Sequence, residues 1–249
     1  MREWIYGRNS VYEALRAGRR QFFRLLIAEG VQEKGRLVDV QGICAKKKVP
    51  IERVKRARLD ALAENHQGLA LESSAYPYSN LVDILEHAQQ YQEPPFILIL
   101  DTIQDPQNLG TLLRTAEIVG VHGVLLPFRH AATITPSVVN ASSGASEHLL
   151  VAQVNLAQAI ESLKEAGVWV FGLEDNPEAK DIVEIHLDGA LALVVGNEAE
   201  GMRPLVRSSC DGLLKLPMRG KIESYNAAVA GSIGLFMSWR ARNFSGSRD

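Results

Sequence analysis

Three segments of the sequence place polar side chains and glycine directly after runs of apolar residues. The first spans residues 101–120, DTIQDPQNLGTLLRTAEIVG, and contains Asn108 and Arg114. Asp105-Pro106 predicts a turn, and Asn108 is expected to be the N-cap of the helix that follows. An arginine near the start of a helix can hold a phosphate through its planar fork of donors. An ordinary capped helix with a surface arginine has the same pattern, so this segment alone does not decide the function.

The second segment is residues 191–202, LALVVGNEAEGM, in which an apolar run leads into Gly196, Asn197, Glu198 and Gly201. Two glycines after a strand allow the backbone to pass close to a ligand. The segment lacks the Lys-Ser/Thr of a phosphate-binding P-loop and the GxGxxG spacing of a dinucleotide site. Its acids would repel a pyrophosphate but tolerate a cofactor that carries a positive sulfonium or amino group. A sharp strand-to-helix turn with solvated acids is the alternative.

The third segment is residues 214–235, LKLPMRGKIESYNAAVAGSIGL, in which an apolar run ends at Leu216-Pro217 and a basic loop follows. Ser224 and Asn226 lead from this loop into a helix rich in alanine and glycine. Such small residues let a backbone closely approach a bound ligand, a threaded chain or a second subunit. An ordinary close contact between a helix and a sheet would use the same residues.

The elements that position these segments alternate between strands and helices from Phe96 onward. Continuous apolar runs are typical of strands buried on both faces of a parallel sheet, and they occur at residues 96–101, 123–126, 168–172, 191–195 and 212–216. Helical patterns occur at residues 108–119, 156–165 and 226–240. This order predicts an α/β doubly wound domain, in which ligands bind beyond the carboxyl ends of the strands.

The front part of the chain predicts a second, smaller α/β domain over residues 1–75. Its helices are expected at residues 10–18 and 35–48, and its strands at 22–28, 49–54 and 68–71. Residues 76–95 are expected to be a linker that contains a short helix at 81–90. The larger domain then covers residues 96–242, and residues 243–249 form a flexible tail.

Charge is distributed unevenly between these parts. Residues 1–76 hold 15 Lys and Arg against 9 Asp and Glu, whereas the rest of the chain holds 12 against 20. A basic front part favours binding to a polyanion, although chance clustering on a solvated surface gives the same counts.

Other features narrow the class of protein. The first residues are charged and mixed, unlike a secretory signal, and no apolar run approaches the roughly 20 residues needed to cross a bilayer. Cys44 and Cys210 lie far apart without CxxC spacing, so reduced thiols are expected. The six histidines have no metal-ligand spacing. We therefore expect a cytoplasmic protein that binds neither a membrane nor a metal.

In this order and spacing, the three segments resemble the motifs of the SpoU (TrmH-like) family of SPOUT RNA methyltransferases. The family pattern Asn-x-Gly-x-x-x-Arg-Thr corresponds here to Asn108, Gly110, Arg114 and Thr115. The second and third motifs correspond to Gly196, Glu198 and Gly201, and to Pro217, Met218, Ser224 and Asn226. The stretches IYGRNSVYEAL (5–15) and ENHQGLAL (64–71) resemble the two ends of a substrate-binding domain found in many members, which is similar to a ribosomal-protein RNA-binding fold.

The resemblance implies an α/β SPOUT domain with a parallel sheet and a deep trefoil knot, behind a small N-terminal RNA-binding domain. S-adenosylmethionine would bind in the knot, largely through backbone groups. The residues that match this cofactor site are Leu173, Val195, Gly196, Asn197, Glu198, Leu216, Pro217, Met218, Tyr225, Asn226 and Ala227. Family members are homodimers whose active site is completed across the interface, and the helices that follow Asn108 and Asn226 are the candidates for that interface.

The implied reaction is attack of a ribose 2′-oxygen on the methyl group of the cofactor. Arg114 matches an arginine that has been regarded as the base in this family, but a guanidinium stays protonated at neutral pH. We therefore expect Arg114 to hold the adjacent phosphate and stabilise the developing alkoxide, with the proton passing to Glu198 or water. Asn108, Ser224 and Asn226 would orient Arg114, the ribose and the cofactor.

Length and motif positions most resemble the bacterial enzymes that methylate a guanosine ribose in 23S rRNA. Ribose methylation of tRNA is the alternative, and a resistance-type rRNA enzyme or an RNA-binding module without activity is also open. Family members often have Leu-Asn-Val-Ser where this chain has Tyr225-Asn226-Ala227-Ala228. This departure changes the wall of the expected cofactor pocket. It also weakens the inference that this chain has the same substrate as a particular family member.

Overall fold

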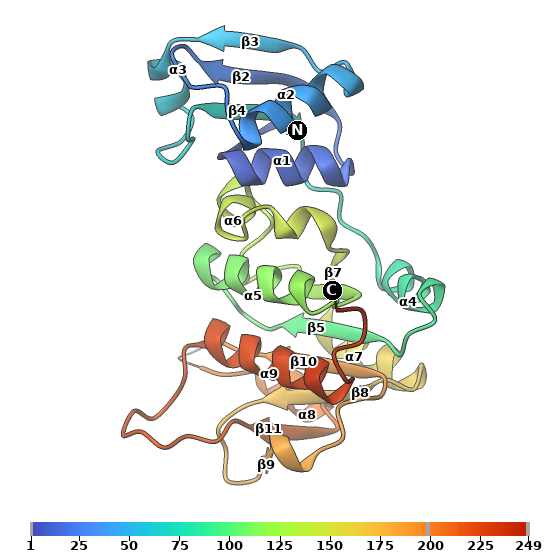
Figure 1. Ribbon diagram of the computed structural model, residues 1–249. Helices are drawn as coiled ribbons and strands as arrows, with labels where there is room; N and C mark the ends of the chain where they lie inside the picture. Colours follow the sequence, from blue (N-terminus) through green and yellow to red (C-terminus); the bar gives the residue numbers. More distant parts are fainter. Residues whose placement is uncertain (1, 198–199, 248–249) are drawn as a thin grey trace. The chain divides into compact units, whose positions relative to one another are not determined.

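The computed structural model describes residues 2–197 and 200–247 of the chain (Figure 1). The chain forms two compact units. The first unit contains the residues up to Pro77 together with Ile134–His148, and the second contains Tyr78–Thr133 and the residues from Leu149 onward.

The first unit is built on a four-stranded sheet with the order β1-β4-β2-β3. Strands β1 (Arg2–Tyr6) and β2 (Phe22–Ala28) each run antiparallel to β4 (Leu69–Ser74), and β3 (Ile51–Val54) runs parallel to β2. Helices α1 (Arg8–Ala17), α2 (Arg36–Lys47) and α3 (Arg56–Asp60) connect the strands. The predicted small α/β domain is therefore present, with β1 as an additional edge strand.

A segment from the middle of the chain completes the first unit. It contains α6 (Pro136–Ala141) and the 3-10 turn η1 (Ala145–His148). The buried guanidinium of Arg20 donates from Nε and Nη2 to the two carboxylate oxygens of Glu147 at 2.8 and 2.7 Å, and from Nη1 to Glu3 at 2.8 Å. Burial alone lowers the pKa of a guanidinium, but the bonds and charges of Glu147 and Glu3 raise the pKa of Arg20 above its ordinary value.

The second unit contains a seven-stranded sheet with the order β7-β6-β5-β10-β8-β11-β9. All of its neighbouring strands pair in parallel. The strands are β5 (Phe96–Leu100), β6 (Gly123–Pro127), β7 (Val151–Val154), β8 (Trp169–Leu173), β9 (Lys180–Asp181), β10 (Leu191–Val195) and β11 (Gly212–Lys215). This confirms the predicted α/β fold with a parallel sheet, whereas the trefoil knot stays a prediction.

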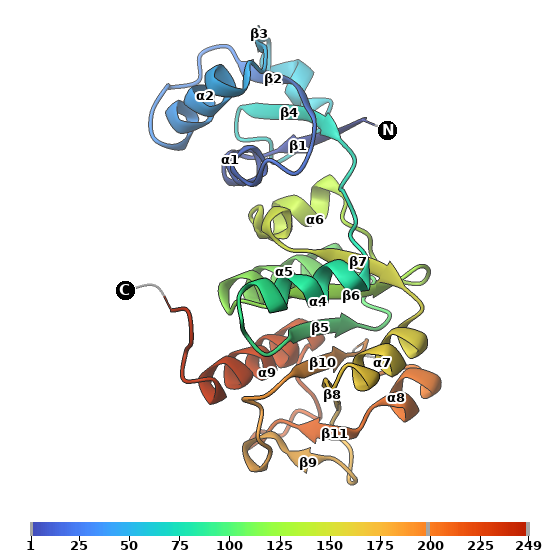
Figure 2. The ribbon, with the colours of Figure 1, turned by 90° about the vertical axis from the view of Figure 1, so that its right-hand side faces the viewer.

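Helices cover both faces of this sheet (Figure 2). On one face, α4 (Leu81–Gln90), α7 (Leu156–Glu165) and α8 (Pro204–Ser209) pack their apolar side chains against Ile97, Ile99 and Val194. On the other face lie α5 (Pro106–Ile118) and α9 (Ala227–Ala241), with the 3-10 turn η2 (Ile182–Glu184) beside α9. None of the helices among the described residues is long and apolar enough to span a membrane.

Helices α5 and α9 pack closely because α9 is rich in small residues. Thr115 Oγ1 and Ser232 Oγ lie 2.9 Å apart across the contact. A Cβ atom on Gly231 would lie 2.5 Å from Leu112 Cδ2, so no larger residue fits there without a shift. The alanine- and glycine-rich sequence after Asn226 therefore serves a helix–helix and helix–sheet contact in this unit.

One local prediction was wrong. Asp105, not Asn108, is the N-cap of α5, because its side chain accepts a hydrogen bond from the backbone N–H of Gln107 at 3.1 Å. Pro106 occupies the first turn, where its fixed φ and missing N–H suit a helix start. Asp105-Pro106 therefore begins the helix rather than forming a separate turn before it.

Candidate functional site

A cavity of about 360 Å³ lies at the carboxyl ends of β8, β10 and β11 in the second unit. Its floor is formed by residues at the ends of these strands, and its other walls come from the loops that follow β10 and β11 and from the first turn of α9. This is the edge of a parallel sheet at which ligands bind in doubly wound folds.

Most of the predicted cofactor residues line this one cavity. They are Leu173, Val195, Gly196, Asn197, Leu216, Met218, Tyr225 and Ala227, and Ser224 from the predicted catalytic set joins them. Pro217 and Asn226 lie in the same loop but are not among the lining residues. Glu198 lies outside the described residues.

Five further lining residues were not among the predicted cofactor residues. These are Glu174, Asp175, Gly201, Glu223 and Ala230, of which Gly201 had been singled out as a glycine of the second motif. The signal for two of them was present, because Glu174-Asp175 directly follows an apolar run at 168–173 in the same way that other polar residues follow strands. With them, the described lining contains three carboxylates and no Lys, Arg or His. Such a cavity favours a cationic ligand over a phosphate.

The loop after β10 is tight and closed on itself. The backbone N–H of Asn197 donates to the carbonyl of Gly201 at 3.1 Å, and the N–H of Gly201 donates to the carbonyl of Asn197 at 2.9 Å. A Cβ atom on Gly196 would lie 2.4 Å from the backbone carbon of Gly201, a distance that no real structure tolerates. Glycine at 196 is therefore required for the loop to fold back beside the cavity.

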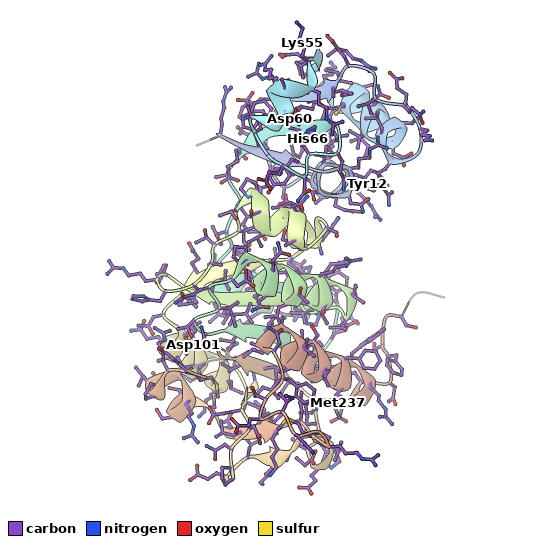
Figure 3. The ribbon with its side chains drawn as sticks, turned by 90° about the vertical axis from the view of Figure 1, so that its left-hand side faces the viewer. Tyr12, Lys55, Asp60, His66, Asp101 and Met237 are labelled. Carbon is purple, nitrogen blue, oxygen red and sulfur yellow. The ribbon has the colours of Figure 1, made fainter. Side chains whose placement is uncertain are left out.

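Two arginine–carboxylate pairs hold this loop from the strands on either side of β10. Asp101 follows β5 and accepts from Arg203 Nε at 2.7 Å and from the backbone N–H of Arg203 at 2.8 Å. Glu174 follows β8 and accepts from Arg207 Nε at 3.0 Å. Asp101 is completely buried (labelled in Figure 3), whereas both members of the second pair reach solvent. The first pair is therefore the stronger anchor of the loop.

The loop after β11 is held at its two ends. Tyr225 Oη donates to the carbonyl of Pro217 at 3.1 Å, which joins the last residues of the loop to its first. Asn226 is the N-cap of α9, where its side chain accepts from the N–H groups of Ala228 and Val229. Its amide also donates to Asn108 Oδ1 at 3.2 Å, so the first and third sequence motifs meet at this point.

Arg114 is the predicted residue that stands apart. It lies on the exposed side of α5 and is not among the residues that line the cavity of its own chain. Asn108 is likewise not among the lining residues, and its bond to Asn226 joins it to the loop that borders the cavity. The chain thus groups the predicted cofactor residues in one place and leaves the predicted phosphate-binding arginine on the surface of a neighbouring helix.

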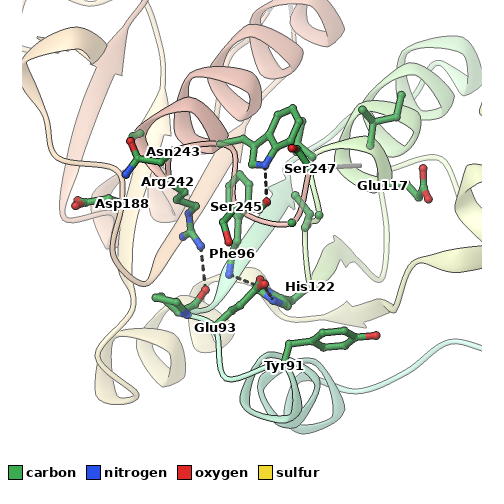
Figure 4. A pocket seen from close by; sticks show the side chains of 18 of the residues that line it. Tyr91, Glu93, Phe96, Glu117, His122, Asp188, Arg242, Asn243, Ser245 and Ser247 are labelled. Carbon is green, nitrogen blue, oxygen red and sulfur yellow. Dashed lines mark hydrogen bonds and ion pairs between the residues drawn. The ribbon is translucent and has the colours of Figure 1, made fainter. Parts of the chain in front are cut away.

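A second cavity, of about 850 Å³, lies at the opposite edge of the same sheet (Figure 4). His122 precedes β6 there; its Nδ1 accepts from the N–H of Phe96 at 3.0 Å and its Nε2 lies 3.3 Å from Glu93. Burial lowers the pKa of His122, so the ring is neutral near pH 7. Arg242 lies against the ring of Phe96 and donates to the carbonyls of Pro94 and Pro95. These bonds anchor the end of α9, whereas the buried atoms His87 Nδ1 and Arg242 Nε in the same cavity have no hydrogen-bond partner among the described residues.

No group of three or more His, Cys, Asp or Glu within the part of the chain that the structure describes is arranged to hold a metal ion. The buried thiol of Cys44 and the half-buried thiol of Cys210 are both free. Burial raises the pKa of Cys44 to about 11 and that of Cys210 to about 12, so neither is a reactive thiolate near neutral pH.

Comparison with known protein families identifies the family to which this chain belongs. Residues 95–236 match the SpoU rRNA methylase family, which is more than half of the chain. The chain belongs to the SpoU methylase family. Residues 4–79 match a second family, the RNA 2′-O ribose methyltransferase substrate-binding domain. Both matches confirm the resemblance found in the motifs.

Relatives of known name agree with this membership. A Bacillus subtilis protein named as a TrmH family tRNA/rRNA methyltransferase is 41% identical over 243 residues, which cover 97% of this chain and 96% of the relative. A Staphylococcus aureus protein with the same family name is 39% identical over 241 residues, or 96% of each chain. The family is therefore shared over nearly the whole length.

Solved structures share the fold. The SpoU methyltransferase AviRb from Streptomyces viridochromogenes, crystallised with AdoMet, has a TM-score of 0.81 at 21% identity and matches 98% of this chain and 92% of its own. An AdoMet-bound rRNA methyltransferase from Sinorhizobium meliloti has a TM-score of 0.80 at 25% identity, with 99% and 88% covered. Both units of this SpoU methylase thus have counterparts within single known chains.

Proposed function

We propose that this SpoU methylase transfers a methyl group from S-adenosylmethionine to the ribose 2′-hydroxyl of a guanosine in 23S rRNA, in the cytoplasm. The observation that carries the proposal is the cavity at the carboxyl ends of β8, β10 and β11, whose described lining has carboxylates, glycine and backbone groups but no basic side chain. A sulfonium cofactor meets no repulsion there, whereas a nucleotide phosphate would.

The residues present fit S-adenosylmethionine. Leu173, Val195 and Leu216 offer an apolar floor at the strand ends, and Gly196 and Asn197 bring backbone groups to the wall. Tyr225 adds an aromatic ring. Glu198, in the second motif, completes this set in the proposal. When bound, the cofactor supplies an already activated methyl group, so the protein's main task is to position the ribose oxygen in line with it.

The residues of the first and third motifs divide the remaining work. Ser224 lines the cavity and would bond to the ribose or the cofactor. Asn226 and Asn108 form a hydrogen-bonded pair that fixes the starts of α9 and α5 relative to each other. Arg114 would hold the phosphate next to the target ribose and stabilise charge on its 2′-oxygen, while Glu198 or water accepts the proton.

The position of Arg114 favours an active site completed by a second copy of the chain. Arg114 lies on exposed surface of α5, and apolar side chains on α5 and α9 are exposed as well: Ile118 by 60%, Val229 by 46% and Phe236 by 50%. Exposed apolar side chains on two packed helices are typical of a subunit interface. In a homodimer formed through this face, Arg114 of one subunit would serve the cavity of the other.

The substrate is proposed from the front unit. A separate domain matching a ribose-methyltransferase substrate-binding family precedes the catalytic part. Such a domain, rather than short basic extensions, favours a large folded RNA, and the Sinorhizobium meliloti neighbour is named as an rRNA methyltransferase. The relatives' names cover both tRNA and rRNA, so tRNA is the second candidate.

Transfer of radiolabelled methyl from S-adenosylmethionine to unmodified 23S rRNA, 16S rRNA and tRNA tests the proposal. Label at one alkali-resistant linkage in 23S rRNA is the expected result, because a 2′-O-methyl group blocks alkaline cleavage at that position. Alkali-resistant label in tRNA would make tRNA the substrate in place of 23S rRNA and would leave the proposed ribose methylation unchanged. If alkaline hydrolysis released the label in mononucleotides rather than in an alkali-resistant dinucleotide, ribose methylation would be refuted.

A further inference from the structure

A polar cleft of about 570 Å³ lies within the first unit, away from the cavity described above. It is bounded by the start of α1, the connection between β2 and α2, the start of α3 and the loop before β4. The side chains that matter here are three bases, Arg8, Lys34 and Arg56, and one acid, Glu29. The cleft therefore has an excess of positive charge.

The three basic side chains make few or weak interactions within the protein, so they can contact a ligand. Lys34 is exposed and has no ion-pair partner among the described residues. Arg56 is paired only with Asp60 at 3.8 Å, and the two side chains are 68% and 55% exposed. Such an exposed pair contributes little and is easily exchanged for another anion. The guanidinium of Arg8 makes one long bond, from Nε to the carbonyl of Gln67 at 3.4 Å.

The wall of the cleft is fixed by a buried histidine. His66 Nδ1 accepts from the N–H of Gly68 at 2.9 Å, and its Nε2 lies 2.8 Å from Asp60 Oδ1. Figure 3 shows His66 and Asp60 close together in this unit. His66 is completely buried, so the loop is held from inside. The HQG stretch of the sequence thus acquires a structural role.

The loop that His66 holds also fixes Arg8. Gln67 has a φ of +52°, and its side-chain oxygen accepts from the backbone N–H of Arg8 at 2.9 Å. A Cβ atom on Gly68 would lie 2.7 Å from Val31 Cγ2, so the loop lies directly against the β2–α2 connection. The two loops and the start of α1 therefore form one preorganised wall, which reduces the entropy lost when a ligand binds.

We propose that this cleft binds the phosphate backbone of the substrate RNA, with Arg8, Lys34 and Arg56 contacting phosphates. Phosphate oxygens suit the guanidinium forks of the two arginines and the point charge of the lysine. A polyanion is favoured over a small anion because the segment that contains the cleft, residues 1–76, carries 15 basic against 9 acidic residues in all. The inference deepens the proposed function, since it rests on RNA being the substrate.

The chain offers a matched control for this cleft. Lys46 and Lys47 are exposed at the end of α2, whereas Lys34 precedes its start. The helix has 12 residues, so the two sites are about 18 Å apart along its axis. Lys34→Gln/Arg56→Gln and Lys46→Gln/Lys47→Gln remove the same charge from the same domain. All four side chains are exposed, so both variants should keep the wild-type melting temperature.

The experiment measures affinity for an unmodified 23S rRNA transcript against KCl concentration, with S-adenosylmethionine binding measured by calorimetry in parallel. For the cleft variant we expect at least tenfold weaker RNA binding and a salt slope that is smaller by about 1.5 to 2, because each lost phosphate contact removes close to one released counterion. The control variant should weaken binding less than threefold, and cofactor affinity should not change in either.

Four outcomes are informative. Selective loss in the cleft variant supports the cleft as the RNA site. Equal loss in the two variants would overturn it, because overall charge alone would then explain binding. A wild-type protein that binds cofactor but no RNA would overturn both the cleft and the RNA-directed function, whereas RNA binding untouched by the cleft variant overturns only the cleft.

Discussion

The substitution Arg203→Met tests the anchor of the loop after β10. Asp101 is completely buried, and its carboxylate receives two short hydrogen bonds from Arg203. Methionine removes the charged donor but keeps the backbone N–H, so one of the two bonds to the carboxylate survives. The carboxylate is then left in the interior with a single neutral donor.

The magnitude follows from the burial. The substitution leaves the completely buried Asp101 carboxylate without its charged partner, a loss that costs about 3–5 kcal/mol, and we expect the low end, about 3 kcal/mol, because Arg203 itself is 42% exposed and the second bond remains. In a chain of this size about 1 kcal/mol lowers the melting temperature by roughly 2–4 °C, so a decrease of roughly 6–12 °C is expected. The affinity for S-adenosylmethionine should fall at the same time, because Gly196 and Asn197 belong to the loop that Arg203 holds.

Scanning calorimetry and cofactor titration on Arg203→Met, Asp101→Asn and the double variant measure both effects. The double variant should be destabilised by clearly less than the sum of the single variants, because the two residues interact directly. Arg207→Met is the control, and it should lower the melting temperature much less because both members of its pair reach solvent. Strict additivity of Asp101→Asn and Arg203→Met, with unchanged cofactor affinity, would refute the anchor.

Three further predictions concern other parts of the chain. Gly196→Ala places a methyl group against the backbone of Gly201, so the dissociation constant for S-adenosylmethionine should rise at least tenfold by calorimetry; wild-type affinity would contradict the tight loop. Burial lowers the pKa of His122 from its ordinary value of 6.5. The contribution of His122 to folding stability should therefore be constant above about pH 6.5 and be lost as the pH falls through the folded-state pKa. A melting temperature no more pH-dependent than that of His122→Gln would argue against this. Glu147→Gln leaves the buried guanidinium of Arg20 without its main counter-charge and should cost about 3 kcal/mol in urea unfolding, and a cost below about 0.5 kcal/mol would exclude the structural role of the pair.

Five strands of the second unit, β5, β6, β8, β10 and β11, could be predicted because their signal is local, whereas the short strands β7 and β9 were not predicted. The runs at 96–100 and 191–195 are apolar at every position, as expected for strands covered on both faces, and both match the observed strands. Strand β1 was not predicted, because its stability depends on pairing with β4 more than sixty residues away. The placement of 134–148 beside Arg20 depends in the same way on partners that are distant in sequence.

The site was predictable to a similar extent. Leu173, Val195 and Leu216 were assigned to one cofactor site through the family resemblance, and they line one cavity because the carboxyl ends of parallel strands meet at one edge of the sheet. The pair of Asp101 with Arg203 could not, although the acid at the end of FILILD was visible, because nothing local indicates which base reaches it. The surface position of Arg114 likewise depends on the packing of α5 against α9.

A pair of substitutions on one helix tests the location of the cofactor site most directly. Ala230 and Ala241 both lie on α9, and each lines a different cavity of the second unit. Ala230→Phe fills the cavity at the carboxyl ends of the strands, and Ala241→Phe fills part of the cavity at the opposite edge. Calorimetry with S-adenosylmethionine should show no binding to Ala230→Phe and wild-type binding to Ala241→Phe. The reverse result would place the cofactor at the opposite edge of the sheet and contradict the proposed site.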